Sequence, residues 1–386
     1  MANMTMRGVF MLLWVVLSAM SLCGLSLPAA AQTLRRGNLE PHSLDPQLSS
    51  YLFEQVIEHD LYEGLVLFGP GGSVTGGAAR DWAISADGTV YTFHLQRGLR
   101  WSDGEPLTAD DFVYSFRRLV DPATKSPYAF LAAPIRNATE ISSGKEARID
   151  QLGIEAVDAT IVRITLRAPT PYFLSALTNA CFSPVNRRAV ERSGGHLGDP
   201  RTLIGSGAYV LREWTPNSRI VLKRNVRYRD AAHVRISEVR YLPMPNVSEE
   251  YRLYRAGALD ITWDVPADQI TALLAQHAAD FRTFPFFGNY HLAFDLTRPP
   301  FRDNAKLRQA LAMSVDREAL THDITRGGEQ PAYSWVPPGL PGYTPPTFDW
   351  TNAARDARQA QARKLYAEAG YGEAKPLSVR IYGIRT

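Results

Sequence analysis

Cysteine is almost absent from this sequence of 386 residues. It has two cysteines, Cys23 in an apolar N-terminal segment and Cys181 in an apolar stretch further along the chain. If the N-terminal segment is removed, one thiol remains and no intramolecular disulfide can form. We expect Cys181 to be buried as a small apolar side chain. A fold without disulfides is held by its core, and a chain with 45% hydrophobic residues is long enough to build one.

An excess of one charge and a basic run are both missing. Lys and Arg number 42 against 39 Asp and Glu, which gives a net charge of +3. This balance does not predict a nucleic-acid surface. The 21% charged and 10% aromatic residues are typical of a folded protein and exclude disordered, collagen-like and coiled-coil chains. At about 100–200 residues per domain, the length predicts two or three domains.

Signatures of enzymes and metal sites are also absent. The eight histidines never occur in H-x-H or H-x-x-x-H spacing, so a compact metal motif and a metal cofactor are not expected. No G-x-S-x-G, P-loop or strand-linked G-x-G-x-x-G occurs. The nearest approach to a nucleophile turn is Gly205–Gly207, which lacks the flanking pattern. It predicts a tight turn before a strand at Ala208–Leu211, and no catalytic residue is predicted.

Three aspartates are spaced around Trp263, namely Asp260, Asp264 and Asp268. Two carboxylates in different environments could act as a general acid and base. Capping of a helix by Asp268, together with solvation of the other two acids, explains the same pattern. We favour the second interpretation.

One long hydrophobic run is present, and it lies at the N-terminus. Arg7 is the only charge in residues 1–31, and Val9–Leu22 is almost uninterruptedly apolar. Pro28 then precedes three alanines. This order is typical of a secretory signal peptide cleaved after Ala31.

Two alternatives to cleavage are open. Val9–Leu27 is long enough to cross a bilayer as an uncleaved anchor. A lipid attached to Cys23 is disfavoured because the bulky Leu22 precedes it. After residue 31 no second run of this kind follows, so the sequence predicts an exported protein in a soluble compartment.

Strand and helix patterns alternate along the chain. Alternating apolar and polar residues predict strands at Thr89–Leu95, Ile161–Arg167, Arg219–Val226, Val239–Leu242 and Leu377–Ile381. Helical spacing predicts helices at Ala109–Val120, Ser248–Ala256, Ala267–Ala279, Ala305–Ala312, Asp316–Ile324 and Ala353–Ala369. Thr108 and Asp111 form a capping box, Asp316 is a predicted N-cap, and Gly370 marks a helix end. The predicted fold class is therefore mixed α/β.

Aromatic residues stand beside polar ones at four places near element ends. These are Tyr51–Glu54, Trp263–Asp264, Phe286–Phe287 and Tyr290–His291. Such residues either complete a core or line a concave site that buries an apolar ligand. Periodicity does not decide between the two, and at each single position the core is the more frequent outcome.

A series of short motifs runs in order from Leu44 to the last residue. The most specific is Trp101–Ser115, with the sequence WSDGEPLTADDFVYS. The others are Ser43–Pro46, Asp60–Leu65, Tyr91–Leu95, Ser126–Tyr128, Gly205–Tyr209, Arg219–Leu222, Tyr254–Gly257, Asp260–Ile261, Leu307–Leu311, Val315–Arg317, Pro337–Gly339 and Ala367–Tyr371. Together they resemble the periplasmic oligopeptide- and dipeptide-binding proteins of ABC importers, the family 5 extracytoplasmic solute-binding proteins. The oligopeptide branch is the more similar one.

The resemblance implies an α/β, periplasmic binding protein type II-like clamp of two lobes with an extra inserted domain. The implied segments are the signal peptide 1–31, domain I in 32–75 and 200–285, the domain II insertion 76–199, and domain III in 286–386. Members of the family continue further, so the resemblance implies that the second lobe is incomplete. We expect a chain of this length to aggregate or to bind ligand weakly, because sheet edges and apolar surface would be exposed.

The resemblance also implies the function. The ligands would be short peptides, held through their backbone like an added strand while water adapts to their side chains. The partners would be the permease subunits of an ABC transporter in the inner membrane, and the protein would be a monomer without cofactor, metal or nucleic acid. The implied peptide contacts are Tyr51, Leu52, Phe53, Glu54, Tyr114, Trp263, Asp264, Phe286, Tyr290 and His291.

Two departures and two alternatives accompany the resemblance. Gly288 stands where some members carry a disulfide cysteine, and Asn225–Arg229 lacks the proline and tryptophan usual after this asparagine. A member of the family binding another solute, such as a dipeptide, murein peptide, nickel chelate or opine, is one alternative. An exported hydrolase is the other, although the sequence shows no activated nucleophile.

Overall fold

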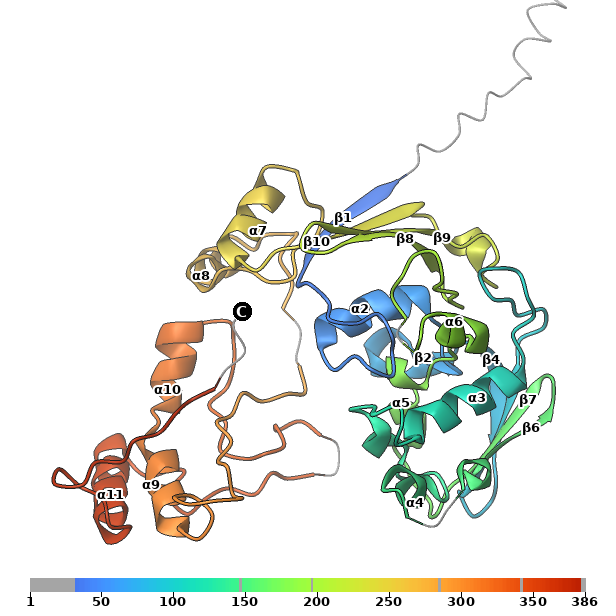
Figure 1. Cartoon of the computed structure of the whole chain (residues 1–386). Helices are drawn as coiled ribbons and strands as arrows, with labels where there is room; N and C mark the ends of the chain where they lie inside the picture. Colours follow the sequence, from blue (N-terminus) through green and yellow to red (C-terminus); the bar gives the residue numbers. More distant parts are fainter. Residues whose placement is uncertain (1–31, 146–147, 196, 284–285, 341–342, 383–386) are drawn as a thin grey trace, which may run out of the picture. The chain divides into compact units, whose positions relative to one another are not determined.

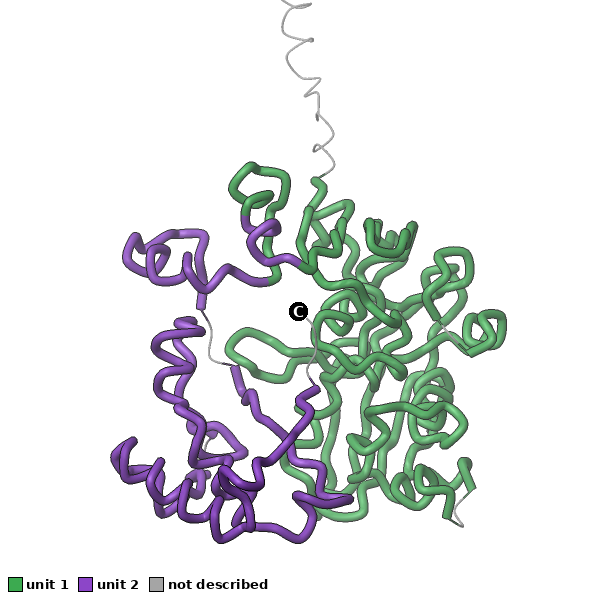
Figure 2. The backbone as a smooth tube through the Cα atoms, turned by 60° about the vertical axis from the view of Figure 1, so that its left-hand side comes forward, with its two compact units in different colours: residues 1–245, 252–263 green, residues 246–251, 264–386 purple. Residues whose placement is uncertain are grey.

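The computed structural model describes residues 32–145, 148–195, 197–283, 286–340 and 343–382 (Figure 1). The predicted signal peptide lies outside these residues. The chain forms two compact units (Figure 2): unit 1 comprises Met1–Pro245 and Arg252–Trp263, and unit 2 comprises Asn246–Tyr251 and Asp264–Thr386. The chain enters unit 2 briefly at Asn246–Tyr251, returns to unit 1, and belongs to unit 2 from Asp264 onward.

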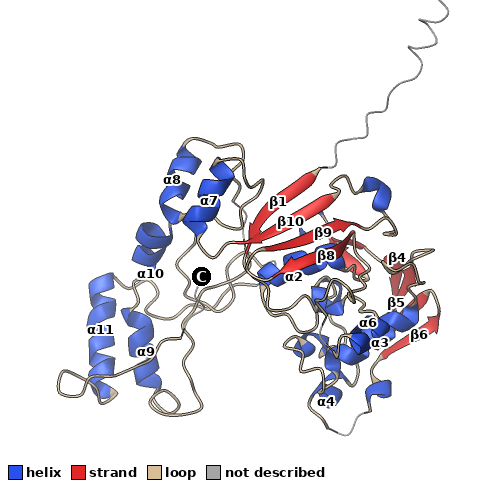
Figure 3. Cartoon of the chain, turned by 45° about the horizontal axis from the view of Figure 1, so that its top comes forward, coloured by secondary structure: helices blue, strands red, loops and turns tan. Residues whose placement is uncertain are grey.

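The first sheet of unit 1 pairs a strand near the beginning of the described chain with a strand about two hundred residues later. Its strand order is β1-β10-β9-β8, with β1 parallel to β10 and the other pairs antiparallel. The strands are β1 (Thr33–Asn38), β8 (Tyr209–Thr215), β9 (Arg219–Arg224) and β10 (Glu238–Pro243). Helix α2 (Leu52–Leu61) packs on one face of this sheet (Figure 3). There, Tyr241 donates to Asp60 of the helix at 2.8 Å. Burial raises the pKa of Asp60 to about 6.

The second sheet of unit 1 is antiparallel throughout, with the order β4-β5-β7-β6. Its strands are β4 (Ala79–Ile84), β5 (Val90–Leu95), β6 (Ile154–Asp158) and β7 (Ile161–Thr165). Tyr91, Phe93 and Leu95 of β5 are buried and alternate with less buried residues, as a strand with one face in the core requires. Helix α3 (Ala109–Val120) supplies Phe112 and Phe116 to the same core, and burying a side chain of this size contributes about 1.5–3 kcal/mol.

Shorter elements complete unit 1. The strands β2 (Val66–Phe68) and β3 (Val74–Gly76) form a small hairpin. The remaining helices are η1 (Pro70–Gly72), η2 (Ala129–Ala132), α4 (Ala138–Ser142), η3 (Ile149–Gln151), α5 (Phe173–Ala176), η4 (Ala180–Phe182), α6 (Arg187–Arg192) and η5 (Ala231–His233).

The described part of unit 2 is built from helices and long irregular segments. The helices are α7 (Val247–Arg255, which spans the boundary of the units), α8 (Ala267–Ala275), α9 (Ala305–Ser314), α10 (Arg317–Ala319), the π-helix η6 (Leu320–Thr325) and α11 (Arg355–Glu368). Its main core cluster consists of Ala310, Met313, Trp350, Ala362 and Leu365. In α10, Asp316 is the N-cap and accepts from the amide of Ala319.

Most predicted elements are confirmed, and two predictions are wrong. The strands at β5, β7, β8, β9 and β10 and the helices at α3, α7, α8, α9 and α11 are present, with ends shifted by a few residues. Leu377–Ile381 forms no strand, because no other segment pairs with it in the described part of unit 2. Asp268 lies inside the first turn of α8, whose N-cap is Pro266, so it does not cap that helix. The predicted helix Asp316–Ile324 is split into α10 and η6.

Candidate functional site

A cluster of aromatic side chains lies at the N-terminus of α2 in unit 1. Phe53 and Ile57 are buried along one face of the helix, whereas Leu52 at its first position is 52% exposed. The Tyr51 ring stacks on that of Phe53 with centroids 5.1 Å apart, and the centroid of the His42 ring lies 5.2 Å from that of Tyr51. We call His42, Tyr51, Leu52 and Phe53 the α2 aromatic cluster. His42 and Leu52 are exposed, Tyr51 is half-buried and Phe53 is buried, so the first three form its surface.

Glu54 sits directly beneath this cluster and is 1% exposed. Its Oε1 accepts from the backbone N–H groups of His42 at 2.7 Å and Ser43 at 3.3 Å. Its Oε2 accepts from Ser50 at 2.9 Å and Tyr51 at 3.1 Å. The carboxylate thus satisfies backbone donors at a helix N-terminus, where a negative charge is favourable. Within unit 1, the Glu54 carboxylate therefore fixes the two loop segments whose amides it binds. The surface above it is formed by neutral side chains and His42.

Tyr128 contacts the segment that carries the cluster, although it was not among the predicted ligand contacts. Its hydroxyl donates to the carbonyl oxygen of Ser50 at 3.1 Å and accepts from Gln55 at 3.3 Å. Phe130, 65% exposed, has its ring 6.2 Å from that of Tyr128. The signal that could have identified Tyr128 is the Ser126–Tyr128 motif, since loop tyrosines with one apolar and one polar end are frequent in binding sites.

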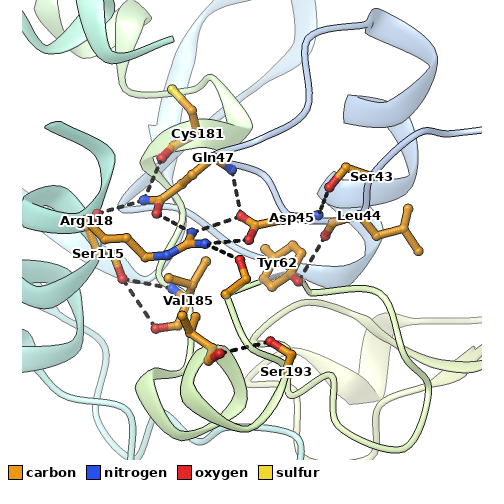
Figure 4. A network of polar contacts seen from close by, with 12 residues as sticks. Ser43, Leu44, Asp45, Gln47, Tyr62, Ser115, Arg118, Cys181, Val185 and Ser193 are labelled. Atoms are coloured by element: carbon orange, nitrogen blue, oxygen red, sulfur yellow. Dashed lines mark hydrogen bonds and ion pairs between the residues drawn. The ribbon is translucent and has the colours of Figure 1, made fainter. Parts of the chain in front are cut away.

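A buried ion pair fixes the turn that leads into the cluster (Figure 4). Arg118 of α3 donates to both carboxylate oxygens of Asp45, at 3.0 and 2.7 Å, and both side chains are almost completely buried. Arg118 also donates to Gln47 at 2.7 Å and to the carbonyl of Gly195 at 3.0 Å. Gln47 in turn donates to the carbonyl of Ser115 at 2.7 Å. The turn is therefore held by planar, bidentate hydrogen bonds that fix its orientation.

The other end of α2 is anchored equally firmly. Glu63 accepts from Arg229 through both carboxylate oxygens at 2.7 Å, and from the hydroxyl of Tyr228 at 2.5 Å. The Gly205–Gly207 turn packs here, because a Cβ on Gly205 would lie 2.2 Å from the carbonyl of Leu61. Ser206 is buried and its Oγ accepts from the amide of Glu63 at 3.0 Å. The tight-turn interpretation of this motif is supported by this packing.

The other predicted ligand residues of unit 1 lie on different elements. Tyr114 of α3 is half-buried, and the Arg187 guanidinium lies 4.9 Å from its ring centroid. Burial raises the pKa of Tyr114. Trp263 is half-buried at the last position of unit 1.

Unit 2 carries the remaining predicted residues. Asp264 is exposed at its start and accepts from the amide of Val265 at 2.8 Å. Phe286 is 74% exposed and Tyr290 is fully exposed. The His291 ring lies 4.4 Å from that of Trp335, whose carbonyl accepts from Asn289. Trp335 was not predicted, and nothing in its local sequence separates it from a core tryptophan.

The described residues contain no group of three or more His, Cys, Asp or Glu side chains arranged to hold a metal ion. Asp260 pairs with Arg35 of β1 at 2.7 Å, which lowers its pKa, whereas Asp264 and Asp268 belong to unit 2. Cys181 is buried, and burial raises the pKa of its thiol, as expected of a small apolar residue. Among the residues that the structure describes, no helix is long and apolar enough to span a bilayer.

Comparison with known proteins agrees with these features. Residues 73–383 match the model of the bacterial extracellular solute-binding proteins, family 5 Middle. The probable deoxycholate-binding periplasmic protein YgiS of Escherichia coli is 38% identical over 96% of this chain and 70% of its own. The murein peptide-binding protein MppA of E. coli is 39% identical over 93% of this chain and 66% of its own. The oligopeptide-binding protein OppA of Salmonella typhimurium is 35% identical over 98% of this chain and 71% of its own.

Solved structures agree with the sequence relatives. The murein tripeptide-binding protein MppA of E. coli matches with a TM-score of 0.86 and 40% identity, covering 90% of this chain and 68% of that chain. OppA of Burkholderia pseudomallei matches with a TM-score of 0.85 and 36% identity, covering 90% of this chain and 69% of that chain. The chain belongs to the family 5 bacterial extracellular solute-binding proteins. Its mixed α/β fold is the fold of that family, as predicted.

Proposed function

We propose that this protein is the substrate-binding component of an ABC importer, which captures oligopeptides in the periplasm and delivers them to permease subunits in the inner membrane. The similarity to oligopeptide-binding and murein-peptide-binding proteins over more than nine-tenths of the chain carries this proposal. The family is one of solute-binding proteins, and we propose that this member has no catalytic activity.

The proposal includes a domain scheme and a set of contacts. Domain I would use residues 32–75 and 200–285, domain II 76–199, and domain III 286–386. The pairing of β1 with β8–β10 in one sheet supports the union of the two domain I segments. The ligand would contact the α2 aromatic cluster above Glu54, with Tyr114, Trp263, Asp264, Phe286, Tyr290 and His291 as further contacts. Export would end with cleavage after Ala31, and the mature protein would be a monomer.

Deoxycholate is a second candidate ligand, and a specific observation favours it. The α2 aromatic cluster offers rings and an exposed leucine, while the Glu54 carboxylate beneath it is used by backbone donors. Such a surface gives apolar contact without selecting for a peptide amine. It suits the steroid of the ligand named for YgiS as well as it suits an apolar peptide side chain.

Native mass spectrometry of the protein purified from an exporting host separates these ligands. Because we expect a chain of this length to bind weakly, co-purified masses that match a ladder of short peptides are expected at low occupancy. Calorimetric titration should then show weak peptide binding that added deoxycholate does not displace. A single bound steroid mass would move the assignment to the second candidate. Absence of binding to peptides, murein tripeptide and deoxycholate by calorimetry would contradict the proposal.

The contribution of the α2 aromatic cluster can be tested at Leu52. Replacing Leu52 with Ser should weaken peptide binding about 10-fold, because burying a leucine side chain against a ligand is worth about 1.5–3 kcal/mol when the burial is complete. The melting temperature should stay unchanged, since the side chain is 52% exposed. Phe68→Ser is the matched control, because Phe68 is 63% exposed at the end of β2, outside the proposed site. If Leu52→Ser and Phe68→Ser bind peptide with equal affinity, the α2 aromatic cluster does not contact the ligand.

A further inference from the structure

Glu58 is a buried carboxyl group one helical turn after Glu54, and nothing in the proposed function uses it. It is 0% exposed, and neither of its side-chain oxygens has a hydrogen-bond partner in the described structure. The hydroxyl of Ser49 faces this carboxyl and is also buried without an aligned partner. An unpaired carboxylate in such a place would cost several kcal/mol, so the group needs either a counter-charge or a proton.

Among the described residues, no cation interacts with Glu58. The titratable groups that do are Glu54, Tyr62, Asp45, Tyr128 and Cys181. Arg118 of α3 interacts with Tyr62 and Asp45 of this set, and it already donates to Asp45, Gln47 and Gly195.

Burial and the two neighbouring acids, Glu54 and Asp45, all raise the pKa of Glu58. Removal from water disfavours the charged form of Glu58, and the nearby Glu54 and Asp45 disfavour it further. The Ser49 hydroxyl acts in the opposite direction, but burial is the largest effect, and the pKa of Glu58 is raised well above its usual range. The unpartnered Ser49 hydroxyl is the acceptor that a carboxylic acid at this position would use.

We propose that Glu58 is a positioning residue, kept as a neutral carboxylic acid whose proton is donated to Ser49 in a hydrogen bond. This bond fixes the turn from Asp45 to Ser50, where the amide of Ser49 also donates to the carbonyl of Asp45 at 3.0 Å. The same turn presents Tyr51 and Leu52. The effect on ligand affinity rests on the proposed function, whereas the protonation of Glu58 and the order of the turn do not.

Ionisation of Glu58 would release its proton to solvent and place a third negative charge beside Asp45 and Glu54. Because its folded pKa lies above the unfolded value of about 4.3, the folded state holds the proton more tightly. The free energy of unfolding therefore falls as pH rises above about 4.3, until the folded pKa is passed. Glu58→Gln keeps the shape and cannot ionise, so its stability should lack this decline.

Two measurements on the full chain test the protonation and the turn. In an infrared pH titration, the C=O stretch of a protonated carboxylic acid should persist to higher pH in the wild type and in Glu140→Gln than in Glu58→Gln. Glu140 is an exposed glutamate of α4 and serves as the matched control. Loss of the band over the same pH range in the wild type and in Glu58→Gln would overturn the proposal.

Hydrogen exchange reports the turn itself. The amides of Ser50 and Tyr51 donate to Glu54, and their protection factors in the wild type should fall as the pH rises through the range in which the infrared band of Glu58 disappears. Glu58→Gln should keep its protection over this range. Ser49→Ala, which keeps the acid but removes its acceptor, should show the lower protection already below this range. Identical pH profiles in the wild type and Glu58→Gln would contradict the positioning role.

Ligand titration separates this proposal from the proposed function. If the protein binds peptide, the affinity of the wild type should decline more steeply than that of Glu58→Gln as the pH rises through the range in which Glu58 ionises. If peptide binds to neither protein at any pH while the infrared and exchange results hold, the peptide assignment fails and the role of Glu58 in the turn stands. If both bind with the same pH dependence, the positioning of the ligand site by Glu58 is refuted.

Discussion

At the scale of single residues, unit 1 uses its buried charges to hold loops. Asp45, Glu54 and Glu63 all come from a short stretch around α2, and each is bound by donors from another part of the chain or from the adjoining loops. The sequence predicted Glu54 as a ligand contact, and that role stays a prediction. Its use by four amides could not be predicted, because chain adjacency does not show which way a carboxylate points. The partners Asp45 and Arg118, 73 positions apart, leave no local pattern either.

The Arg118–Asp45 pair should be a sensitive point for stability. Replacing Arg118 with Met leaves a fully buried carboxylate without its cation, which should lower the free energy of unfolding by about 3–5 kcal/mol. Denaturant unfolding measures this change. Arg163→Met is the matched control, since the Arg163–Glu155 pair at 3.0 Å is exposed and should contribute at most about 1 kcal/mol. If both variants lose the same free energy of unfolding, the buried Arg118–Asp45 pair contributes no more to stability than the exposed pair.

At the scale of elements, prediction succeeded where one face of a helix or strand is buried. The strands β5 and β7 and the helix α3 each carry a strict period of buried side chains, and the structure contains them almost as predicted. Leu377–Ile381 has the same alternation and forms no strand, because a strand also needs a neighbour and a local pattern contains no information about one. The N-terminus of α2 was not predicted as a helix start, since Tyr51 is an unusual N-cap and Glu54 does the capping from inside.

The capping of α3 allows a test on adjacent residues. Asp111 accepts from the amide of Thr108 at 2.8 Å, whereas its neighbour Asp110 is exposed in the same first turn. Replacing Asp111 with Ala should cost about 1 kcal/mol of stability through the lost cap. Asp110→Ala removes the same charge from the helix dipole and should cost about 0.3–1 kcal/mol. Denaturant unfolding of both variants measures the difference, and an equal or larger loss in Asp110→Ala would exclude the capping role.

At the scale of the whole molecule, the two units differ in what holds them together. Unit 1 has a continuous core that includes both sheets, α2 and α3. The described core of unit 2 is a small cluster around α9 and α11, and many of its large apolar side chains are exposed, Phe286, Tyr290 and Trp335 among them. Regions with few buried apolar contacts open at low free energy. Unit 2 should therefore open before unit 1 unfolds.

Hydrogen exchange of the full chain tests this order. Amides of α9 and α11 should exchange faster than those of α3 and β5, because opening of unit 2 leaves the core of unit 1 intact. Leu365→Ala, which truncates a buried side chain of the small cluster, should cost about 2–5 kcal/mol and speed exchange in α9 and α11 alone. Phe116→Ala is its counterpart in the large core and should speed exchange in α3 and β5. If either variant speeds exchange in both units equally, the two units unfold as one and the separate cores do not set the order of opening.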